Sequence, residues 1–420
     1  MRALETVVVG LDGLPADLPG DGWRAASVSL MPGRLGRPYL PASWHTEFVL
    51  AIGEGGAVLG LLPLQRSKSR DVPSAVFDPA ALAPRLFGSV EDARSYLFVG
   101  GCTDLVAGTV TAATLTADQT DDVRRALVGA ARAEAGRRGL VAAAIYVRDG
   151  ERPAFAPTGQ GERSGDGEGP DGRGSLGGRE GSGGGEGSGG GEGSGGGEGS
   201  GGRGSSDEWW CEEVGRCSRI VVPADDERYL ASLAHSRRRT VVQDRRAVVE
   251  AGLRTTVVTA REAVAAGAAL VACVKRRHGL AEHPRLLRMR LSAWAAEPLG
   301  ERLAFVVQAG GGPGRPGDSP DRVEVAPGCP GVEPGRVGVA SGCLAVTFAC
   351  RAGGRLEIYE TGVADDTPLR HAAYVESLVQ APLRYAIDKG LGEIDLGLDA
   401  ETPKTRRGAV LTPVWALRLT

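Results

Sequence analysis

The sequence predicts a mixed α/β fold built from strand–helix–strand units. In one unit, the apolar runs 96–101 and 141–147 flank a segment at 121–138 whose apolar residues recur at helical spacing. In another, a helix containing Leu383 ends at Gly390 and leads into a strand at 394–398, where apolar and polar residues alternate. The 420 residues are enough for two or three domains.

A glycine-rich tract at 159–206 separates these units. It contains a repeated GSGGGE hexad, and Leu176 is its only aliphatic residue. Such a segment cannot bury enough apolar surface to offset its ordering entropy, so we expect a disordered surface insertion. The expected domains are therefore an N-terminal lobe at 1–158, the insertion, and a C-terminal lobe at 207–420 that carries a second Gly/Pro-rich loop at 310–335.

Further elements fill the two lobes. The N-terminal lobe is expected to contain a strand at 6–10 and a hairpin formed by 48–52 and 57–64. The C-terminal lobe is expected to contain helices at 227–252, 261–278 and 286–296, the first of them one long amphipathic helix. Its expected strands are 218–223, 255–259, 303–308, 337–340, 343–350, 355–359 and 409–417.

The composition narrows the class of protein. The net charge is −3 and the isoelectric point is near 6.1, so nucleic-acid binding would require a local basic patch. The seven cysteines form no CxxC pair and there are five histidines, so we expect no metal site. The first residues resemble no signal peptide, and the longest apolar stretch, 263–274, is too short to span a bilayer. We therefore expect a cytoplasmic protein with reduced thiols.

A basic segment, HSRRRTVVQDRR, stands out against this acidic background. Its five arginines are Arg237, Arg238, Arg239, Arg245 and Arg246. Because guanidinium groups bind phosphates in a bidentate manner, the segment is a candidate anchor for the phosphates of an acyl donor, either coenzyme A or tRNA. The alternative is a solvated helix face with a few ion pairs.

Chemistry-bearing residues also follow the strand at 394–398. Lys404, Arg407 and Gly408 lie beyond its C-terminal end, the usual place for function in an α/β sheet. Asp395, on the strand, is a candidate proton acceptor, although a structural role is about equally expected. Four residues on the preceding strand and helix are candidates for contacting an acceptor, or are packing residues with hydrogen-bonded side chains: Tyr359, Glu360, Tyr374 and Tyr385.

The order RYAIDKG, strand, then K-x-x-R-G resembles the last lobe of transferases with the GNAT acyltransferase fold. The resemblance is to the branch containing Fem-type peptidoglycan bridge transferases and their CelD/BioF-like relatives. It implies tandem GNAT-like lobes, each with a mixed sheet flanked by helices. It also implies that Lys404 steadies the negative charge that develops when an amine attacks an acyl group. Pro403 departs from the family pattern, because Fem-type enzymes usually carry an aromatic residue there.

The resemblance further implies an N-acyltransferase without a permanently bound cofactor. The donor would be aminoacyl-tRNA or acyl-CoA, and the acceptor an amine of a cell-wall precursor, a peptide or a natural product. The five arginines, Arg407 and Gly408 would bind the donor. A pyrophosphate-binding motif is missing, since Arg125 lies one residue too far from Gly129. Its absence favours aminoacyl-tRNA.

Two substitutions follow from these roles, and an alternative function stays open. Lys404→Ala is expected to lower turnover and leave folding intact. Reversal of Arg238 and Arg245 to Glu is expected to abolish transfer from aminoacyl-tRNA with little change in Tm. The alternative is a catalytically silent binding module of the same fold that recognises a cell-wall precursor or a partner protein.

Overall fold

The computed structural model describes residues 4–15, 18, 22–25, 27–30, 43–72, 75–88, 92–102, 104–156, 210–280, 282–297, 300–310, 324–325 and 342–419. The glycine-rich tract, most of the loop at 310–335 and the strand expected at 337–340 lie outside these residues. By internal contacts, the described residues of Met1–Phe155 and Trp210–Thr420 belong to one compact unit. The expected lobe boundaries stay a prediction.

The N-terminal part, up to residue 156, is a sheet with one long helix. Its strands are β1 (Glu5–Gly10), β2 (Trp23–Ala25), β3 (Trp44–Ile52), β4 (Val58–Ser67), β5 (Tyr96–Val99), β6 (Val110–Ala112) and β7 (Val141–Arg148). Its α-helices are α4 (Ala117–Arg138) and the one-turn α2 (Pro79–Leu82), α3 (Pro84–Phe87) and α5 (Arg152–Phe155). Short 3-10 helices lie at Leu11–Gly13, Val28–Leu30, Glu54–Gly56, Ala75–Phe77 and Ala93–Ser95. The expected strands, hairpin and helix are confirmed.

Helix α4 shows how the sequence positions these elements. Thr116 and Gln119 form a capping box at its start, and Gly139 ends it in the left-handed conformation with φ 66°. The helix packs closely on β4, where a Cβ atom on Gly60 would lie 2.5 Å from Cγ1 of Val123. Glycine at this strand position therefore allows the close approach of α4, and a larger residue would require Val123 to shift.

The C-terminal part contains the remaining elements. Its strands are β8 (Cys211–Val221), β9 (Leu253–Thr259), β10 (Glu301–Ala309), β11 (Glu324–Val325), β12 (Cys343–Ala352), β13 (Arg355–Val363), β14 (Glu393–Asp395) and β15 (Val410–Arg418). Its α-helices are α6 (Asp226–Ser232), α7 (His235–Glu250), α8 (Ala260–Arg277), α9 (Pro284–Ala295), α10 (Arg370–Val375), α11 (Ala381–Asp388) and α12 (Glu401–Thr405). A π-helical turn, Glu376–Gln380, connects α10 to α11.

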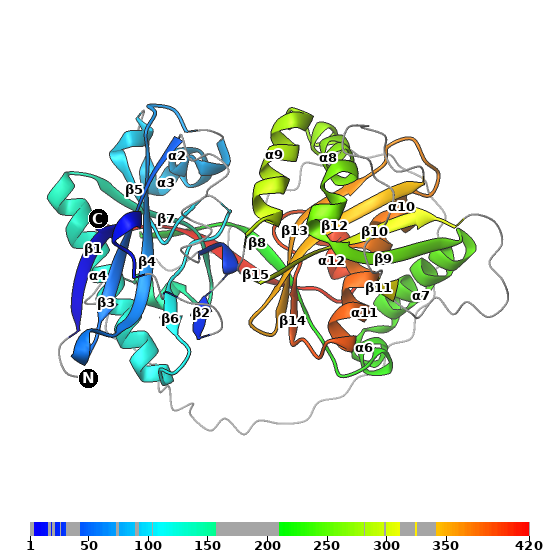
Figure 1. Ribbon diagram of the computed structural model, residues 1–420, viewed down its shortest axis with the longest axis horizontal. Helices are drawn as coiled ribbons and strands as arrows, with labels where there is room; N and C mark the ends of the chain where they lie inside the picture. The colour runs from blue at the N-terminus through cyan, green and yellow to red at the C-terminus, as the bar shows by residue number, and fades with distance from the viewer. Residues whose placement is uncertain are drawn as a thin grey trace, which may run out of the picture. The chain divides into compact units, whose positions relative to one another are not determined.

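The strands join into one continuous mixed sheet (Figure 1). Its main order is β1-β3-β4-β5-β7-β15-β8-β14-β13-β12-β10-β9-β11, and β6 lies off this path, paired with β2 and β4. Helices cover both faces of its C-terminal part. Leu303 and Phe305 of β10 face a core that contains Tyr229 of α6 and Leu383 of α11, whereas Ala304 faces a core that contains Leu287 of α9. This alternation confirms the predicted mixed α/β class.

One expected helix is broken in the structure, and one expected strand is shorter. The helix expected at 227–252 is broken into α6 and α7, because Leu233 and Ala234 have extended backbones and Leu233 turns into the core. Strand β14 ends at Asp395, since the backbone N–H of Gly397 donates to the Asp395 carboxylate and Gly397 has φ 72°. None of the helices described is both long and apolar enough to cross a bilayer.

Candidate functional site

The parallel strands β13 and β14 separate soon after they meet. They pair over only three residues, Arg355–Glu357 with Glu393–Asp395. Strand β13 then continues to Val363, while the chain after β14 turns away. Ligands of α/β proteins bind beyond the carboxyl ends of parallel strands. The residues that follow Glu357 and Asp395 therefore define the candidate site.

Strand β13 contains a β-bulge at this point. Against β12, Glu360 pairs with Phe348 and Ile358 with Ala349, so Tyr359 is one extra residue. Bulges are frequent next to active sites, where they redirect a strand. The bulge lies two residues beyond the last residue of β13 that pairs with β14.

Asp395 is buried at the end of β14 and is held from three directions. Its carboxylate forms an ion pair with Arg148 at 2.5 Å and accepts hydrogen bonds from the Cys217 thiol at 3.1 Å and the Gly397 N–H at 2.9 Å. Burial alone would raise the pKa of Asp395, but Arg148 and these hydrogen bonds outweigh it and lower the pKa. Asp395 is therefore an ionised carboxylate with both oxygens engaged.

Lys404 lies in the short helix α12, where a loop was expected, and its side chain is buried. Its ammonium donates to the carbonyl oxygens of Leu398, Leu396 and Gly397 at 2.7, 2.8 and 3.3 Å. Burial lowers the pKa of Lys404 to about 8, against the opposing effect of nearby acidic groups. The three N–H groups of the ammonium match three acceptors, so the lysine stabilises the backbone turn that follows β14.

Cys217 of β8 completes this cluster. The Arg148 guanidinium donates to its sulfur at 3.0 Å, and the thiol in turn donates to Asp395. Burial raises the pKa of Cys217 to about 12. A thiol that stays protonated at neutral pH is a poor nucleophile, so the site does not favour a covalent cysteine intermediate.

Arg407 and Gly408 connect α12 to the helices beneath it. The buried Arg407 guanidinium contacts both Asp244 oxygens, at 2.8 and 3.1 Å, and the Pro403 carbonyl oxygen at 2.7 Å. Gly408 has φ 86°, and a Cβ atom there would lie 2.7 Å from Cδ2 of Leu233. These contacts are structural, and the expected role of both residues in donor binding stays a prediction.

The five arginines of the basic segment divide into two groups on α7. Arg238 donates to the carbonyl oxygens of Leu230, Ala231 and Leu233, where α6 ends, and Arg245 binds Asp226 and Gln380. Arg237, Arg239 and Arg246 are exposed, and no acidic partner for them is found in the described part of the chain. These three are accessible to an anionic ligand.

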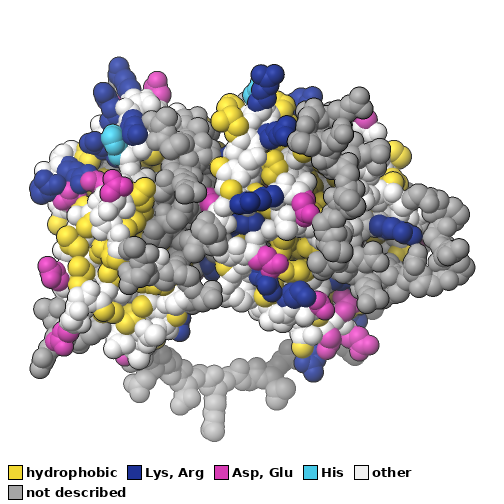
Figure 2. Space-filling view, in the orientation of Figure 1, with side chains coloured by type: hydrophobic (Ala, Val, Ile, Leu, Met, Phe, Trp, Pro, Cys, Tyr) yellow, Lys and Arg dark blue, Asp and Glu magenta, His cyan; other side chains and the backbone are white. Residues whose placement is uncertain are grey.

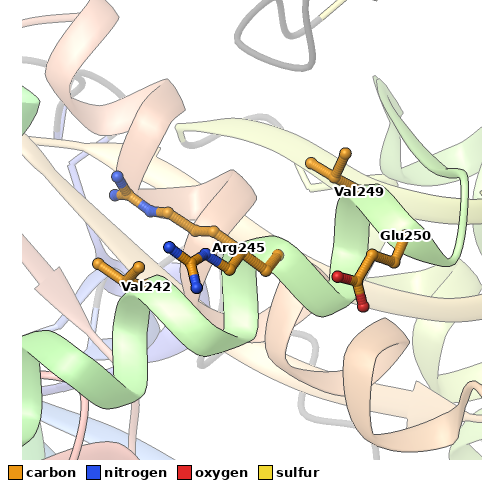
Figure 3. A pocket seen from close by; sticks show the side chains of 5 residues that line it. Val242, Arg245, Val249 and Glu250 are labelled. Carbon is orange, nitrogen blue, oxygen red and sulfur yellow. The ribbon is translucent and has the colours of Figure 1, made fainter.

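A shallow pocket of about 300 Å³ lies along the second half of α7. Figure 3 shows Val242, Arg245, Val249 and Glu250 along this side of the helix, and Arg246 completes the lining. The lining combines two arginines and two valines with the Glu250 carboxylate. It lies on the expected donor-binding helix.

The four expected acceptor residues lie in different environments. The Tyr359 ring stacks on Trp294 with 4.5 Å between centroids, and Tyr359 and Glu360 both bind Arg290. Tyr374 and Tyr385 belong to the core on the opposite face of the sheet, where burial raises the pKa of Tyr385 to about 12. The structure brings the first two together and separates them from Tyr385.

Sequence reasoning missed the partners of the expected residues. Arg148, the last residue of β7, pairs with Asp395, and Asp244 on α7 pairs with Arg407. Arg290 binds Glu360 from α9. The sequence position of Arg148 could have indicated a site residue, because this charged residue directly follows the apolar run 141–147. The residues described contain no cluster of three or more His, Cys, Asp or Glu side chains that could hold a metal ion.

Comparison with known proteins gives a structural likeness. No family model matches the sequence, and no curated protein matches it. The solved structure of FemX has a TM-score of 0.52 at 10% identity, covering 99% of this chain and 97% of that chain. This likeness shows a shared fold and, with the observed sheet, confirms the predicted fold class.

Two further structures are similar at lower scores. One is the C-terminal domain of a putative lysylphosphatidylglycerol synthetase from Agrobacterium fabrum, with a TM-score of 0.44, 9% identity, and coverage of 88% of this chain and 83% of that chain. The other is a tandem GNAT protein from the clavulanic acid biosynthesis pathway, with a TM-score of 0.41, 10% identity, and coverage of 100% and 99%.

Proposed function

We propose that this protein is an N-acyltransferase. It transfers an acyl or aminoacyl group from aminoacyl-tRNA or acyl-CoA to an amine of a cell-wall precursor, a peptide or a natural product. The observation that carries the proposal is the separation of β13 and β14 after three residue pairs, next to the bulge at Tyr359. This arrangement lies within a fold shared with FemX.

The proposed reaction is a direct displacement. The amine nitrogen attacks the acyl carbonyl carbon, a C–N bond forms, and the C–O bond of an aminoacyl ester or the C–S bond of a thioester breaks. The amine loses a proton and the leaving group gains one. An ammonium next to the carbonyl oxygen stabilises the oxyanion that develops. We propose Lys404 for this role, with the oxyanion replacing its longest contact, the Gly397 carbonyl oxygen at 3.3 Å.

Asp395 has a different role in this proposal. Its pKa is lowered and both of its oxygens have donors, so it is a poor proton acceptor at neutral pH. We assign it to holding Arg148 and the backbone of Gly397 in place next to Lys404. The attacking amine then gives its proton to the leaving group or to solvent.

The arginines of α7 support aminoacyl-tRNA as the donor. Arg239 and Arg246 are seven residues apart, which places them on one side of the helix two turns apart. Two exposed cations about 10 Å apart along the helix fit separate phosphates of an extended polyanion better than one small ligand. Coenzyme A is the other candidate donor.

A binding module without catalysis is the second candidate function. It is favoured by the contacts of Lys404 and Asp395, because the lysine N–H groups and the aspartate oxygens already have protein partners. Such a module would bind an amine-bearing ligand, such as a cell-wall precursor, and transfer nothing to it.

Mass spectrometry separates the two functions. The protein is incubated with mixed aminoacyl-tRNAs or, in parallel, with mixed acyl-CoAs, together with peptidoglycan precursors, peptides and small amines. We expect one acceptor to gain the mass of one acyl group in the presence of one donor class. An acceptor that binds but gains no mass with any donor would support the binding module and contradict the proposed activity.

A further inference from the structure

The outer corner formed by α8 and α9 exposes large apolar side chains. Leu280, which follows α8, is 53% exposed, and Leu286 and Met289 of α9 are 58% and 68% exposed. The opposite face of α9 is anchored, since Leu287 and Leu291 are fully buried in the core between α9, α8 and the sheet. Leu286 and Met289 are therefore held in position by a helix whose other face is packed in the core.

The exposed face of α9 has an apolar side and a cationic side. At 100° per residue, Leu286, Met289 and Ala293 fall within about 60° of one another. Arg285, Arg288 and Ser292 occupy the adjacent sector of the same exposed face. Figure 2 shows dark-blue and yellow side chains next to one another over α9.

The exposed charged side chains of this corner are mainly positive. Arg276, Arg285 and Arg288 are exposed, and none of them has an acidic partner within the described residues. The nearby acids are already engaged, because Glu282 binds Lys275 and Arg290. The corner therefore presents uncompensated positive charge next to exposed apolar side chains.

A pocket between α8 and α9 extends this surface. Its volume is about 250 Å³, and its lining combines two arginines and a hydroxyl group with small apolar side chains. The lining residues are Arg261, Val264, Ala265, Arg288 and Ser292. Its size and charge suit a phosphate-containing group.

We propose that the α8–α9 corner binds the surface of a membrane that contains anionic phospholipid. Arg276, Arg285 and Arg288 contact lipid phosphates, while Leu280, Leu286 and Met289 enter the acyl-chain boundary. Interfacial helices bind by this combination of an apolar strip and flanking cations, and they need no membrane-spanning length. The proposal goes beyond the transferase activity and does not depend on it.

The apolar side chains favour a membrane over a nucleic acid. Phosphate contacts to RNA need cations, and single-stranded bases stack on aromatic rings, but the exposed apolar residues of this corner are Leu and Met. The exposed arginines of α7 are less suited to a membrane, because Val249 is the only large apolar side chain exposed on that helix. The two basic surfaces thus fit different anionic partners.

Vesicle sedimentation tests the proposal with the full-length chain. One set of vesicles is phosphatidylcholine alone, and the other contains equal parts of phosphatidylcholine and phosphatidylglycerol. We expect binding to the second set at low salt and weak binding to the first. Arg285→Gln/Arg288→Gln should weaken binding about fivefold per arginine, from about 1 kcal/mol for each cation. Leu286→Gln/Met289→Gln should weaken it at least about tenfold.

A matched control has the same charge loss elsewhere. Arg239→Gln/Arg246→Gln removes two exposed arginines from α7 and should leave vesicle binding unchanged. Equal losses in the control and the α9 pair, or no binding to anionic vesicles, would overturn the proposal. Displacement of the protein from anionic vesicles by inorganic phosphate or tRNA at matched ionic strength would also overturn it. A third contradicting result would be a dimer in size-exclusion chromatography that Leu286→Gln/Met289→Gln converts to a monomer, because the apolar side chains would then bind a second copy of the chain. Thermal melts check that each variant is folded. If Leu286→Gln/Met289→Gln does not fold, the result for Arg285→Gln/Arg288→Gln decides the test.

Discussion

Lys404 has a structural role that its sequence position did not reveal. Its ammonium holds three consecutive backbone carbonyl groups in the turn after β14. Removing the side chain takes the lysine donor from the carbonyl oxygens of Leu396 and Leu398, of which Leu396 is buried, while the Gly397 oxygen keeps the Ser218 N–H, and losing a donor to a buried oxygen is costly. The expectation that Lys404→Ala leaves folding intact is therefore revised.

We predict that Lys404→Ala lowers the free energy of unfolding by about 1 to 3 kcal/mol. The control is Lys389→Ala, because Lys389 is partly exposed and pairs with the neighbouring Asp388. Urea denaturation of both variants measures the effect. If Lys404→Ala were as stable as Lys389→Ala, the three carbonyl contacts would contribute nothing to stability.

The pKa of Lys404 gives a pH test of its proposed role. A group with a pKa of about 8 is charged below that pH and neutral above it. If the ammonium stabilises the oxyanion, kcat/KM of the unmodified protein should fall, relative to Lys404→Arg, as the pH rises through about 8. The comparison cancels titration of the acceptor amine. A ratio that rises through this pH would indicate a neutral lysine acting as a base instead.

At the scale of the element, α7 carries both structural and accessible arginines. Arg238 caps the end of α6, and Arg245 is paired with Asp226. Reversing these two charges would break contacts within the fold, so the expectation of an unchanged Tm is revised. The accessible Arg239 and Arg246 are the better test of donor binding.

We predict that Arg239→Gln/Arg246→Gln weakens binding of aminoacyl-tRNA and leaves Tm unchanged. Each lost phosphate contact should reduce the slope of log Kd against log salt by about 0.7 to 0.9. The matched control is Arg24→Gln/Arg85→Gln, which removes two exposed arginines from the N-terminal part. Filter binding across a salt series measures the slopes. Identical slopes for both pairs would exclude Arg239 and Arg246 as tRNA contacts.

Local periodicity predicted most helices and strands because burial repeats along each element. The α6–α7 break was missed, since apolar spacing continues across Leu233 while its backbone turns. The end of β14 was missed as well, because it depends on a hydrogen bond from Gly397 to Asp395. Helix and strand ends that are set by side-chain contacts leave no signal in the periodicity of the sequence.

Contacts in the candidate site between residues far apart in the sequence could not be predicted either. The local order of helix, strand and loop was enough to predict that Lys404, Asp395 and Arg407 lie near one strand end. Their partners Arg148, Cys217 and Asp244 lie far away in the sequence. Pairing of β15 with both β7 and β8 brings such residues together, and the spacing of one sequence cannot specify it.

At the scale of the whole molecule, the chain leaves and re-enters the compact unit at neighbouring points. The Arg152 guanidinium lies 5.6 Å from the centre of the Trp210 ring and donates to the Cys211 sulfur. A short linker can therefore connect the two described ends of the chain, at residues 156 and 210. We predict that replacing 159–206 with a few residues changes Tm little, because closure entropy varies with the logarithm of length.

Differential scanning calorimetry of the shortened protein checks this prediction. An equally long Gly/Ser replacement of the tract is the control for linker length. A large loss of Tm in both proteins would show that the native tract sequence stabilises the fold.

The most direct test of the proposed site is amide hydrogen exchange of the full-length protein with and without the donor that supports transfer. The site is proposed where β13 and β14 separate, beyond Glu357 and Asp395. We predict that the donor slows exchange at 358–363 and 396–405. Protection confined to the N-terminal part of the chain, with none in these two segments, would contradict the account.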